Sequence, residues 1–513
     1  MNNLANNLVP QEEITPIITI NGKPAVRLPG DFHLVSEFAE NLGRLVKGHG
    51  IYVRKGIAFT LNLDTQRLEP ATPTWLRTWV EKHAVPFRNS NQGGDIQITK
   101  SMSKDNAEAV LASEQFLDQL PKVERFHPCP MPVLRKDGSI ELLPIGLDEE
   151  SHTFTADPEF LIEPDSLIDA RMVLDTLLNE FAWPDDQGRS KAVHIAAMLT
   201  VFAGGIMPPD SIKPVFFYTS NAEGSGKTTL AQLAGMPYRS TPVETAPKDE
   251  AEWQKKLLTV AISGRRLLLL DNLKGHLNSG AFEAYTTSSQ FTGRILGGSK
   301  EFTGEAGATV LITGNGLTIT PDLRRRSLFV ELFLKELRAE DRKFKRILDP
   351  YAIASMRREV LCALWGLVHE WDKARRKDAS VQNASFYNSS FPRWCESIAA
   401  IVEFAGYGCP TIPAEIDGMG DTDTADISSL LEVMESGKHY EFSDLTNIAI
   451  EQGLFERFTS DLDPGNPLEL SRRAKRQFAS ILKRYDNRRV KDNPVFLVQG
   501  KGHSRRYLKS SDT

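Results

Sequence analysis

Cysteine is scarce in this sequence of 513 residues: it occurs four times, as Cys129, Cys362, Cys395 and Cys409, and never as a CxxC pair. The scarcity excludes a disulfide framework and a cysteine-based zinc cluster, and it favours a reducing compartment. Long hydrophobic runs are also missing. The longest, residues 192–207, contains His194 and a Gly-Gly pair, whereas a membrane-spanning helix needs about 20 apolar residues. We therefore expect a cytoplasmic protein without membrane contact.

The N-terminus lacks a basic segment followed by an apolar core, so we expect no secretory signal. Hydrophobic residues make up 41% and charged residues 25% of the chain, close to ordinary globular values, which excludes a wholly disordered or fibrous protein. The length predicts about three domains of roughly 150 residues each.

Positive charge is concentrated near the C-terminus. The net charge is −6, but residues 471–513 contain 13 Lys and Arg against three Asp, so this segment carries +10 and the rest of the chain −16. A basic segment on an acidic body indicates contact with a polyanion. A solvated charged tail is the alternative, although such a tail would lack the apolar residues that alternate here with the bases, such as Phe478 and Leu482.

The patterns predict a mixed α/β chain. Apolar runs at residues 215–218, 267–270 and 309–313, each bounded by turns, are typical of a parallel sheet covered on both faces. In the N-terminal part we expect helices over 32–46 and 73–82 and strands over 50–54 and 57–63. The expected segments are an α+β domain (1–165), a helical lead-in (166–211), an α/β core (212–335), a helical region (336–410), an acidic linker (411–440) and a small basic domain (441–513).

A phosphate-binding loop follows the first of these strands. Residues 221–228 match the GxxxxGK[ST] pattern except that Asn221 replaces the first Gly, and Asn tolerates positive φ well enough for the turn to survive. Backbone N–H groups and the following helix N-terminus would bind phosphates, with Lys227 on the β- and γ-phosphates and the Thr228 hydroxyl on Mg²⁺. The alternative is a chance Gly-Lys-Thr in a surface loop. The expected nucleotide-binding residues are Asn221, Gly224, Ser225, Gly226, Lys227, Thr228 and Thr229.

The second apolar strand ends in Asp271, 44 positions after Lys227, in the Walker B arrangement. We expect Asp271 to hold Mg²⁺ through water, although buried strands that merely end in Asp are common. Most ATPases of this kind place a Glu next as the base, whereas this chain has Asn272, which can orient a water molecule but cannot accept its proton. Fast hydrolysis is therefore less strongly indicated than binding, with Glu283 and Glu301 as possible substitutes for the base.

The third strand leads into Gly314-Asn315-Gly316, and an arginine cluster at 324–326 follows shortly afterwards. Asn315 at a strand tip can orient the attacking water, or it can belong to an ordinary turn. Arginines that reach a neighbour's γ-phosphate stabilise transition-state charge and accelerate hydrolysis by about 10³–10⁵. We favour Arg325 and Arg326 for this role, with a solvated basic turn as the alternative; a finger acting in trans implies a ring.

These motifs fall within about 100 residues, in the order P-loop, Asp-Asn, Thr-Gly-Asn and Asp-Leu-x-Arg-Arg. The order resembles that of AAA+ superfamily-3 and MCM-like helicases of viruses, plasmids and mobile elements. Residues 146–157 and 179–200 resemble the segments that precede the ATPase in phage-type primase-helicases, with Leu147 in place of a Tyr. The resemblance implies ATP and Mg²⁺ as cofactors, DNA as partner and a hexameric ring. It also implies a hairpin at 293–300 whose Arg294 and Lys300 touch single-stranded DNA, although a plain surface hairpin would look the same.

The C-terminal segment predicts helices followed by a basic β-hairpin, which is typical of a winged helix. Its bases would contact DNA phosphates and supply affinity rather than sequence choice, unless the domain packs only against protein. The expected contacts are Arg472, Arg473, Lys475, Arg476, Lys501, Arg505 and Arg506.

Together the patterns and the resemblance indicate an ATP-dependent DNA helicase or replication initiator ATPase of a phage or integrated mobile element, working with other replication proteins. An AAA+ loader or regulator that binds DNA without unwinding it, or an ATPase of anti-phage defence, remains an alternative.

Overall fold

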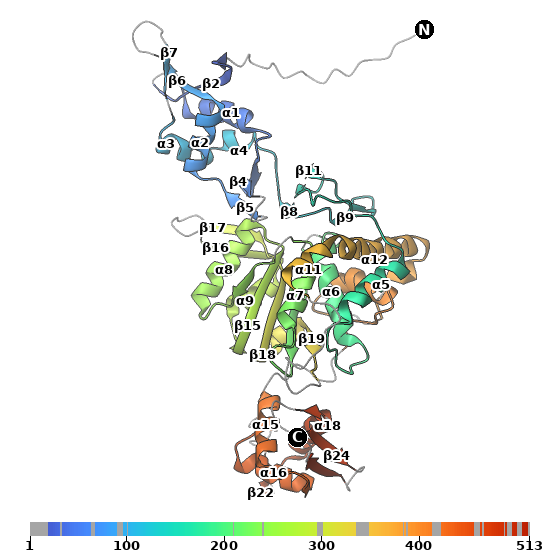
Figure 1. The fold of residues 1–513 in the computed structure, drawn as a ribbon. Helices are drawn as coiled ribbons and strands as arrows, with labels where there is room; N and C mark the ends of the chain where they lie inside the picture. The colour runs from blue at the N-terminus through green and yellow to red at the C-terminus, as the bar shows by residue number, and fades with distance from the viewer. Residues whose placement is uncertain are drawn as a thin grey trace. The chain divides into compact units, whose positions relative to one another are not determined.

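The computed structural model describes residues 19–30, 33–62, 67–89, 96–99, 101–208, 210–238, 241–294, 301–334, 348–382, 384–385, 388–412, 422–455, 462–463, 466–486, 488–489, 495–499 and 505–510. The chain divides into two compact units. One comprises Met1–Phe126 and Gly146–Phe154, and the other comprises His127–Ile145 and Thr155–Thr513. Figure 1 shows the order of the elements along the chain.

The first unit is α+β. Its helix α1 (Val35–Val46) buries Phe38, Leu42 and Val46 at the four-residue spacing of an amphipathic helix. The other helices are α2 (Pro73–His83), α3 (Lys104–Leu111) and α4 (Glu114–Leu117), and the strands are β1 (Thr19–Ile20), β2 (Lys23–Arg27), β3 (Ile51–Arg54), β4 (Ile57–Asn62), β5 (Arg67–Pro70), β6 (Val85–Asn89) and β7 (Ile96–Ile98). They form the sheets β1-β2-β6-β7 and β3-β4-β5. The expected helices and strands are all present, shortened by up to three residues at their starts or shifted by one at their ends.

The expected end of the N-terminal domain at residue 165 differs from the structure. Three short strands, β8 (Arg125–His127), β11 (Gly146–Asp148) and β12 (Thr153–Thr155), form a sheet where the chain passes between the units. Beyond them Cys129, Met131 and Ile162 are buried in the same core as the helices that follow. These residues, together with the hairpin β9 (Pro132–Leu134) and β10 (Ile140–Leu142), therefore belong to the second unit.

The centre of the second unit is a five-stranded parallel sheet of order β14-β15-β18-β13-β19. Its strands are β13 (Val215–Ser220), β14 (Val243–Thr245), β15 (Leu267–Leu277), β18 (Thr309–Ile319) and β19 (Ser327–Leu332). Because β18 lies between β13 and β15, the strand before the loop at 221–228 and the strand of Asp271 both flank the strand that contains Asn315. The predicted mixed α/β core with a parallel sheet is confirmed.

Both faces of this sheet are covered. Leu267 and Leu269 join the core formed with the helices of the unit, whereas Leu268 and Leu270 are fully buried on the opposite face, since alternate residues of a strand point to opposite faces. Helix α7 (Lys227–Ala234) packs on β13, β15 and β18. Helices α8 (Glu250–Ser263) and α9 (Gly280–Thr287) pack on each other. The continuous apolar runs of the strands are explained by this double cover.

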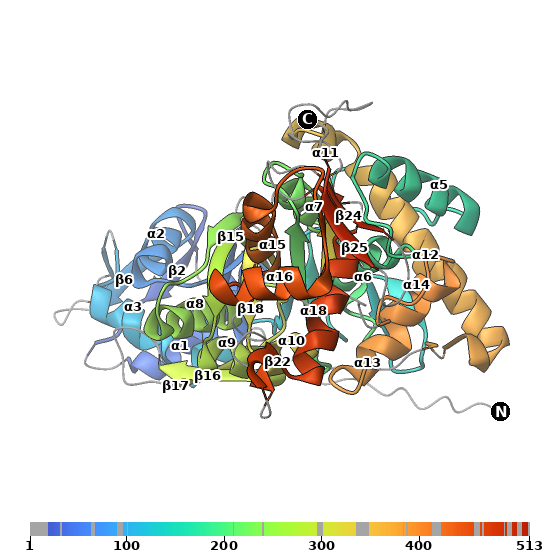
Figure 2. The ribbon, with the colours of Figure 1, turned by 90° about the horizontal axis from the view of Figure 1, so that it is seen from below.

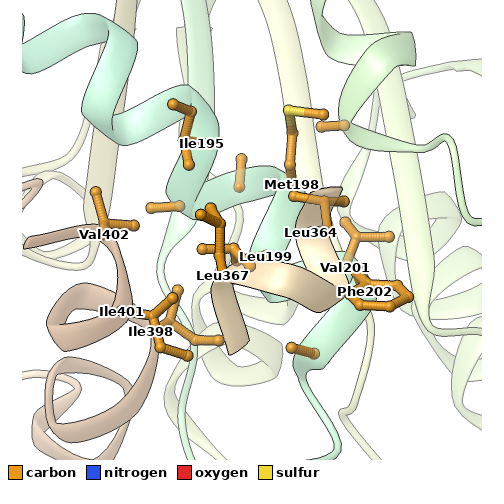
Figure 3. Packing of buried hydrophobic residues seen from close by; sticks show 14 of the residues in the cluster. Ile195, Met198, Leu199, Val201, Phe202, Leu364, Leu367, Ile398, Ile401 and Val402 are labelled. Atoms are coloured by element: carbon orange, nitrogen blue, oxygen red, sulfur yellow. The ribbon is translucent and has the colours of Figure 1, made fainter. Parts of the chain in front are cut away.

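The helical segments before and after the sheet share one core with it. Helices α5 (Leu167–Leu178) and α6 (Arg189–Ala203) both pack against the long α12 (Arg357–Lys377), and α6 also packs on β19. Figure 3 shows part of this packing between α6, α12 and residues 395–402. The remaining helical elements are α10 (Pro321–Arg325), α11 (Pro350–Ser355), a 3₁₀ turn (Ala379–Gln382), α13 (Pro392–Trp394), a π-turn (Cys395–Ala399) and α14 (Ala400–Phe404).

The C-terminal domain has its own core and begins earlier than expected. Helix α15 (Thr422–Val433) buries Ile427, Leu430 and Leu431 among residues of the basic segment. The expected linker at 411–440 therefore does not extend over this helix. The other elements are β20 (His439–Tyr440), α16 (Phe442–Glu451), β21 (Leu462–Asp463), β22 (Asn466–Leu470), α18 (Arg472–Arg484), β23 (Arg488–Arg489), β24 (Val495–Gln499) and β25 (Arg506–Lys509), with an antiparallel sheet β20-β25-β24-β23. Figure 2 shows α15, α16, α18, β24 and β25 together.

Candidate active site

The loop between β13 and α7 presents backbone at a helix N-terminus. Gly224 (φ 69°) and Gly226 (φ 92°) take left-handed conformations that favour glycine, and no side chain caps α7, whose N-cap is Gly226. A Cβ at Gly226 would lie 3.4 Å from the ring of Phe181. Ser225 is buried, and Lys227, Thr228 and Thr229 begin the helix. A helix start with N–H groups uncapped by a side chain is suited to an anion such as phosphate.

Asn221 does not take the positive φ that we expected of it, since the glycines supply the left-handed turns of this loop. Its amide is instead paired with the backbone of Leu334, just beyond β19. Asn221 Nδ2 donates to the Leu334 carbonyl and the Leu334 N–H donates to Asn221 Oδ1, both at 2.8 Å. The side chain therefore joins the loop at 221–228 to the segment just after the edge strand β19, which a glycine could not do.

The Lys227 ammonium lies among oxygens of its own loop. Lys227 Nζ donates to Ser220 Oγ at 2.8 Å, to Ser225 Oγ at 3.2 Å and to the Ala222 carbonyl at 3.3 Å. These acceptors are neutral, and hydrogen bonds from an ammonium to charged phosphate oxygens are stronger than bonds to neutral oxygens. The lysine can therefore exchange them for the oxygens of a polyphosphate. The sequence had not singled out Ser220.

Asp271 accepts hydrogen bonds from hydroxyl groups on two elements. Thr228 Oγ1, on α7, donates to Asp271 Oδ1 at 2.6 Å, and Thr313 Oγ1, on β18, donates to the same oxygen at 2.5 Å. Hydroxyl and carboxylate oxygens are ligands that suit Mg²⁺, which commonly takes one or two carboxylates together with phosphate oxygens. Among the described residues no group of three or more His, Cys, Asp or Glu could hold a metal. A magnesium ion at Thr228 and Asp271 would therefore depend on the nucleotide for further ligands.

Two asparagines lie on the adjacent strands β15 and β18, which continue to Leu277 and Ile319 and do not end at Asp271 and Thr313 as expected. Asn272 has a left-handed backbone (φ 53°), is exposed, and donates its N–H to Thr313 Oγ1 at 3.0 Å. Asn315 Oδ1 accepts a 3.3 Å hydrogen bond from Ser220, the residue that also binds Lys227. The structure thus brings Asn315 next to Ser220, the residue before the loop at 221–228. Thr313, which contacts both Asp271 and Asn272, was overlooked as a site residue, although a polar residue directly after the apolar run 310–312 was a visible signal.

The two glutamates considered as bases have different surroundings. Glu283, on α9, accepts a short hydrogen bond from the hydroxyl of Thr320, and Thr320 is the N-cap of α10, the helix that carries the arginine cluster. Glu301 is exposed on β17 (Glu301–Glu305). Glu283 therefore links the helix after the Asp271 strand to the arginine-bearing helix.

Arg325, the last residue of α10, and Arg326, its C-cap, share one carboxylate. Arg325 Nη2 lies 2.7 Å from Asp322 Oδ1, and Arg326 Nη1 lies 2.9 Å from Asp322 Oδ2. The Arg325 side chain is 58% exposed and that of Arg326 is 18% exposed. Arg325 is therefore outside the core of its own chain and can reach another molecule, at the cost of an exposed ion pair of low energy.

The residues expected to touch DNA occupy two separate regions. Arg294 is exposed at the end of β16 (Gln290–Arg294), which forms an antiparallel hairpin with β17. Lys300, Lys501 and the side chain of Arg473 lie outside the part of the chain that the structure describes. In the C-terminal domain, Arg472 and Arg476 are exposed on α18, Lys475 and Arg505 are partly exposed, and Arg506 pairs with Glu441 at 2.8 Å.

Among the described residues, no helix combines the length and apolarity that would let it cross a membrane. All four cysteines are free thiols.

No family model and no curated protein matches the chain. Among solved structures, it is similar to the apo A form of the NrS-1 C-terminal region, with 10% identity over 86% of this chain and 100% of that chain and a TM-score of 0.34. It is also similar to JCV helicase (12% identity, 48% of this chain and 74% of that one, TM-score 0.23) and to SCCmec type IV Cch, described as an active helicase (12% identity, 88% and 87%, TM-score 0.29). At these low TM-scores the similarity carries no argument about function.

Proposed function

We propose that the chain is an ATP-dependent DNA helicase or replication initiator ATPase of a phage or integrated mobile element. It acts on DNA as a ring of identical subunits, a hexamer, with nucleotide held between neighbours. It works in the cytoplasm with other replication proteins. ATP and Mg²⁺ are its cofactors.

The observation that carries the proposal is the meeting of Thr228, Asp271 and Thr313 beside Lys227. Residues 221–229 would hold the phosphates of ATP, and Thr228 and Asp271 would hold Mg²⁺. When bound, the metal ion supplies positive charge that neutralises the phosphate oxygens. Lys227 adds a second positive charge, and it already lies among the oxygens of the loop.

We assign two further roles, orienting the attacking water and stabilising the transition-state charge, to residues around this centre. Asn315 and Asn272 orient the attacking water. Asn315 accepts a hydrogen bond from Ser220, and Asn272 directly follows Asp271 and donates its N–H to Thr313. Arg325 and Arg326 of a neighbouring subunit stabilise the charge that develops on the transferred phosphoryl group. The exposure of Arg325 supports this role, since a finger that acts in trans must leave the surface of its own subunit. Arg326 is mostly buried, so the exposure supports Arg325 as the finger rather than Arg326.

Contact with DNA is assigned to two basic regions. The C-terminal domain supports a winged helix, because helix α15, strand β20, helices α16 and α18 and the hairpin β24–β25 follow one another around one core. Arg294, at the end of strand β16 of an antiparallel hairpin, supports a second contact with single-stranded DNA. Such contacts to phosphates give affinity without sequence choice.

A second function is favoured by Asn272. An amide in the usual place of an acidic base cannot take a proton from water, so hydrolysis would be slow. Slow turnover suits an AAA+ loader or regulator, or a defence ATPase, that binds DNA without unwinding it.

The test is strand displacement on forked DNA together with DNA-stimulated ATPase activity. We expect both activities in the wild type and neither in Lys227→Ala. Lys255→Ala is the matched control, because Lys255 is an exposed lysine of α8 paired with Glu252. Particle mass with and without nucleotide tests the ring.

The possible results separate the functions. ATPase activity without strand displacement would favour a loader, a regulator or a defence ATPase. Displacement that persists in Lys227→Ala would refute the assignment of ATP to this loop.

A further inference from the structure

A recess with a volume of about 350 Å³ opens on the C-terminal domain where α16 begins, beside α18 and the start of β25. Its lining consists of Glu441, Phe442, Ser443, Lys475, Arg476, Ala479, Arg505, Arg506 and Tyr507. The volume is at the lower end of the range of small-ligand pockets. The recess is therefore large enough for a phosphate group and part of the sugar or base attached to it.

The lining of the recess contains more cations than anions. Four of its residues, Lys475, Arg476, Arg505 and Arg506, are cationic, and one, Glu441, is anionic. Lys475 and Arg476 come from α18 and the other two arginines come from β25 and the residue before it. Positive side chains from two separate elements thus line the same recess. This arrangement favours a bound anion, whereas a solvated helix face would carry its charges on one element.

Glu441 already occupies the place of an anion at this recess. Glu441 Oε1 lies 2.8 Å from Arg506 Nη1 in an exposed ion pair. The same side chain caps α16 by accepting from the N3 backbone, while Asp444 Oδ2 accepts from the Glu441 N–H at 2.7 Å. The carboxylate is therefore held at the rim by the helix cap, next to a helix N-terminus that favours negative charge.

We propose that the recess binds a backbone phosphate of DNA, and that this phosphate replaces the Glu441 carboxylate as the partner of Arg506. The guanidinium forks of Arg476, Arg505 and Arg506 can bind phosphate oxygens in pairs. The exchange leaves Arg506 paired in both states, but it leaves Glu441 beside the phosphate as a repelling charge. Glu441 thus weakens DNA binding. The proposal rests on the DNA-binding role assigned above to this domain.

The test measures DNA binding by the full-length protein without nucleotide, by fluorescence anisotropy at several salt concentrations, on duplex and on single-stranded DNA of equal length. Glu441→Gln keeps an acceptor for the helix cap and removes the charge. We expect its Kd to fall by about twofold to fivefold, the effect of releasing one exposed ion pair. Glu435→Gln is the control, because Glu435 is an exposed glutamate of the same domain, paired with Lys438 and outside the recess.

A second pair of variants tests the cations. Arg476→Gln should weaken binding and lower the salt dependence by about one phosphate contact, whereas Lys438→Gln should not. Glu441→Asn, with a side chain that N-caps favour, gives the same charge change if the Gln variant fails to fold. Tightening seen on one of the two DNA forms identifies that form as the source of the phosphate.

The proposal is overturned if Glu441→Gln and Glu441→Asn behave like Glu435→Gln, or if Arg476→Gln binds like the wild type. ATPase activity is measured in parallel in each variant. Tightened DNA binding without any ATPase activity would refute the proposed ATPase function and support phosphate binding in the recess. ATPase activity with unchanged DNA binding would do the reverse.

Discussion

Thr228 and Asp271 are 43 residues apart in the chain, and Thr228 Oγ1 donates a 2.6 Å hydrogen bond to Asp271 Oδ1. Thr313 donates to the same oxygen. The start of α7 and the middle parts of β15 and β18 thus meet at one carboxylate oxygen. Because that oxygen accepts from two hydroxyls, the carboxylate is held in one orientation before any ligand arrives, and a metal ion would meet a prearranged site.

Asp271→Asn tests the role of this carboxylate in holding Mg²⁺. The amide Oδ1 can still accept from both threonines, so we expect folding and the midpoint of thermal unfolding to change little. Loss of the negative charge should reduce ATPase activity by about 10–100-fold, the usual cost of losing a partner that orients a metal. The measurement is the ATPase rate as a function of Mg²⁺ concentration, in which part of the loss should be recovered at high Mg²⁺. If the dependence of the ATPase rate on Mg²⁺ concentration were unaltered, Asp271 would not be a residue that holds Mg²⁺.

Arg325→Ala tests a finger that acts in trans. Because Arg325 bonds to Asp322 of its own helix, we expect the variant to fold and to bind nucleotide normally, with an ATPase rate reduced by up to about 10³-fold. Mixing it with Lys227→Ala should restore activity, since about a quarter of the interfaces in a random one-to-one mixture would combine an intact loop with an intact arginine. Each variant alone is the control. A mixture no more active than its components would place the arginine in cis or outside the site.

Short motifs with local causes were predictable from the sequence. The loop at 221–228 and the apolar run that leads into Asp271 could be recognised because glycines, a lysine and apolar runs have fixed spacings in such elements. The expected end of that strand at Asp271 was wrong, since β15 continues to Leu277. The bond between Asn221 and Leu334 could not, because it joins residues 113 apart and leaves no periodic signal. The burial of α15 was concealed in the same way: its acidic, polar composition was typical of a linker, and its apolar residues become core only against elements that come later in the chain.

Asn221→Gly changes the loop toward the usual pattern, and we nevertheless expect it to be destabilising. Glycine removes both hydrogen bonds to Leu334, each contributing about 1 kcal/mol, and adds backbone freedom to the unfolded state. The free energy of unfolding should fall by about 2 kcal/mol, and nucleotide affinity should fall with it because the loop loses its tie to the sheet. Urea unfolding and nucleotide titration measure the two effects.

Asn221→Asp provides a graded comparison for this prediction. It keeps the oxygen that accepts from the Leu334 N–H and loses the donor to the Leu334 carbonyl, so its stability should lie between those of the other two proteins. A glycine variant as stable as the wild type would show that the tie is not needed.

His194 should make the stability of the second unit depend on pH. It is fully buried on α6, with Nδ1 3.2 Å from the Tyr218 hydroxyl, and burial lowers its pKa from 6.5 to about 3. Below pH 6.5 the histidine takes up a proton in the unfolded chain, whereas in the folded chain it does so only near pH 3. Its titration therefore does not affect the free energy of unfolding above pH 6.5 and lowers it progressively below that pH. At pH 5 the loss is about 2 kcal/mol. His194→Gln, which cannot titrate, is the comparison. Between pH 7.5 and pH 5 the free energy of unfolding of the wild type, measured in urea, should fall by about 2 kcal/mol more than that of the variant. A constant difference between the two proteins over that range would show that His194 is not the group that titrates.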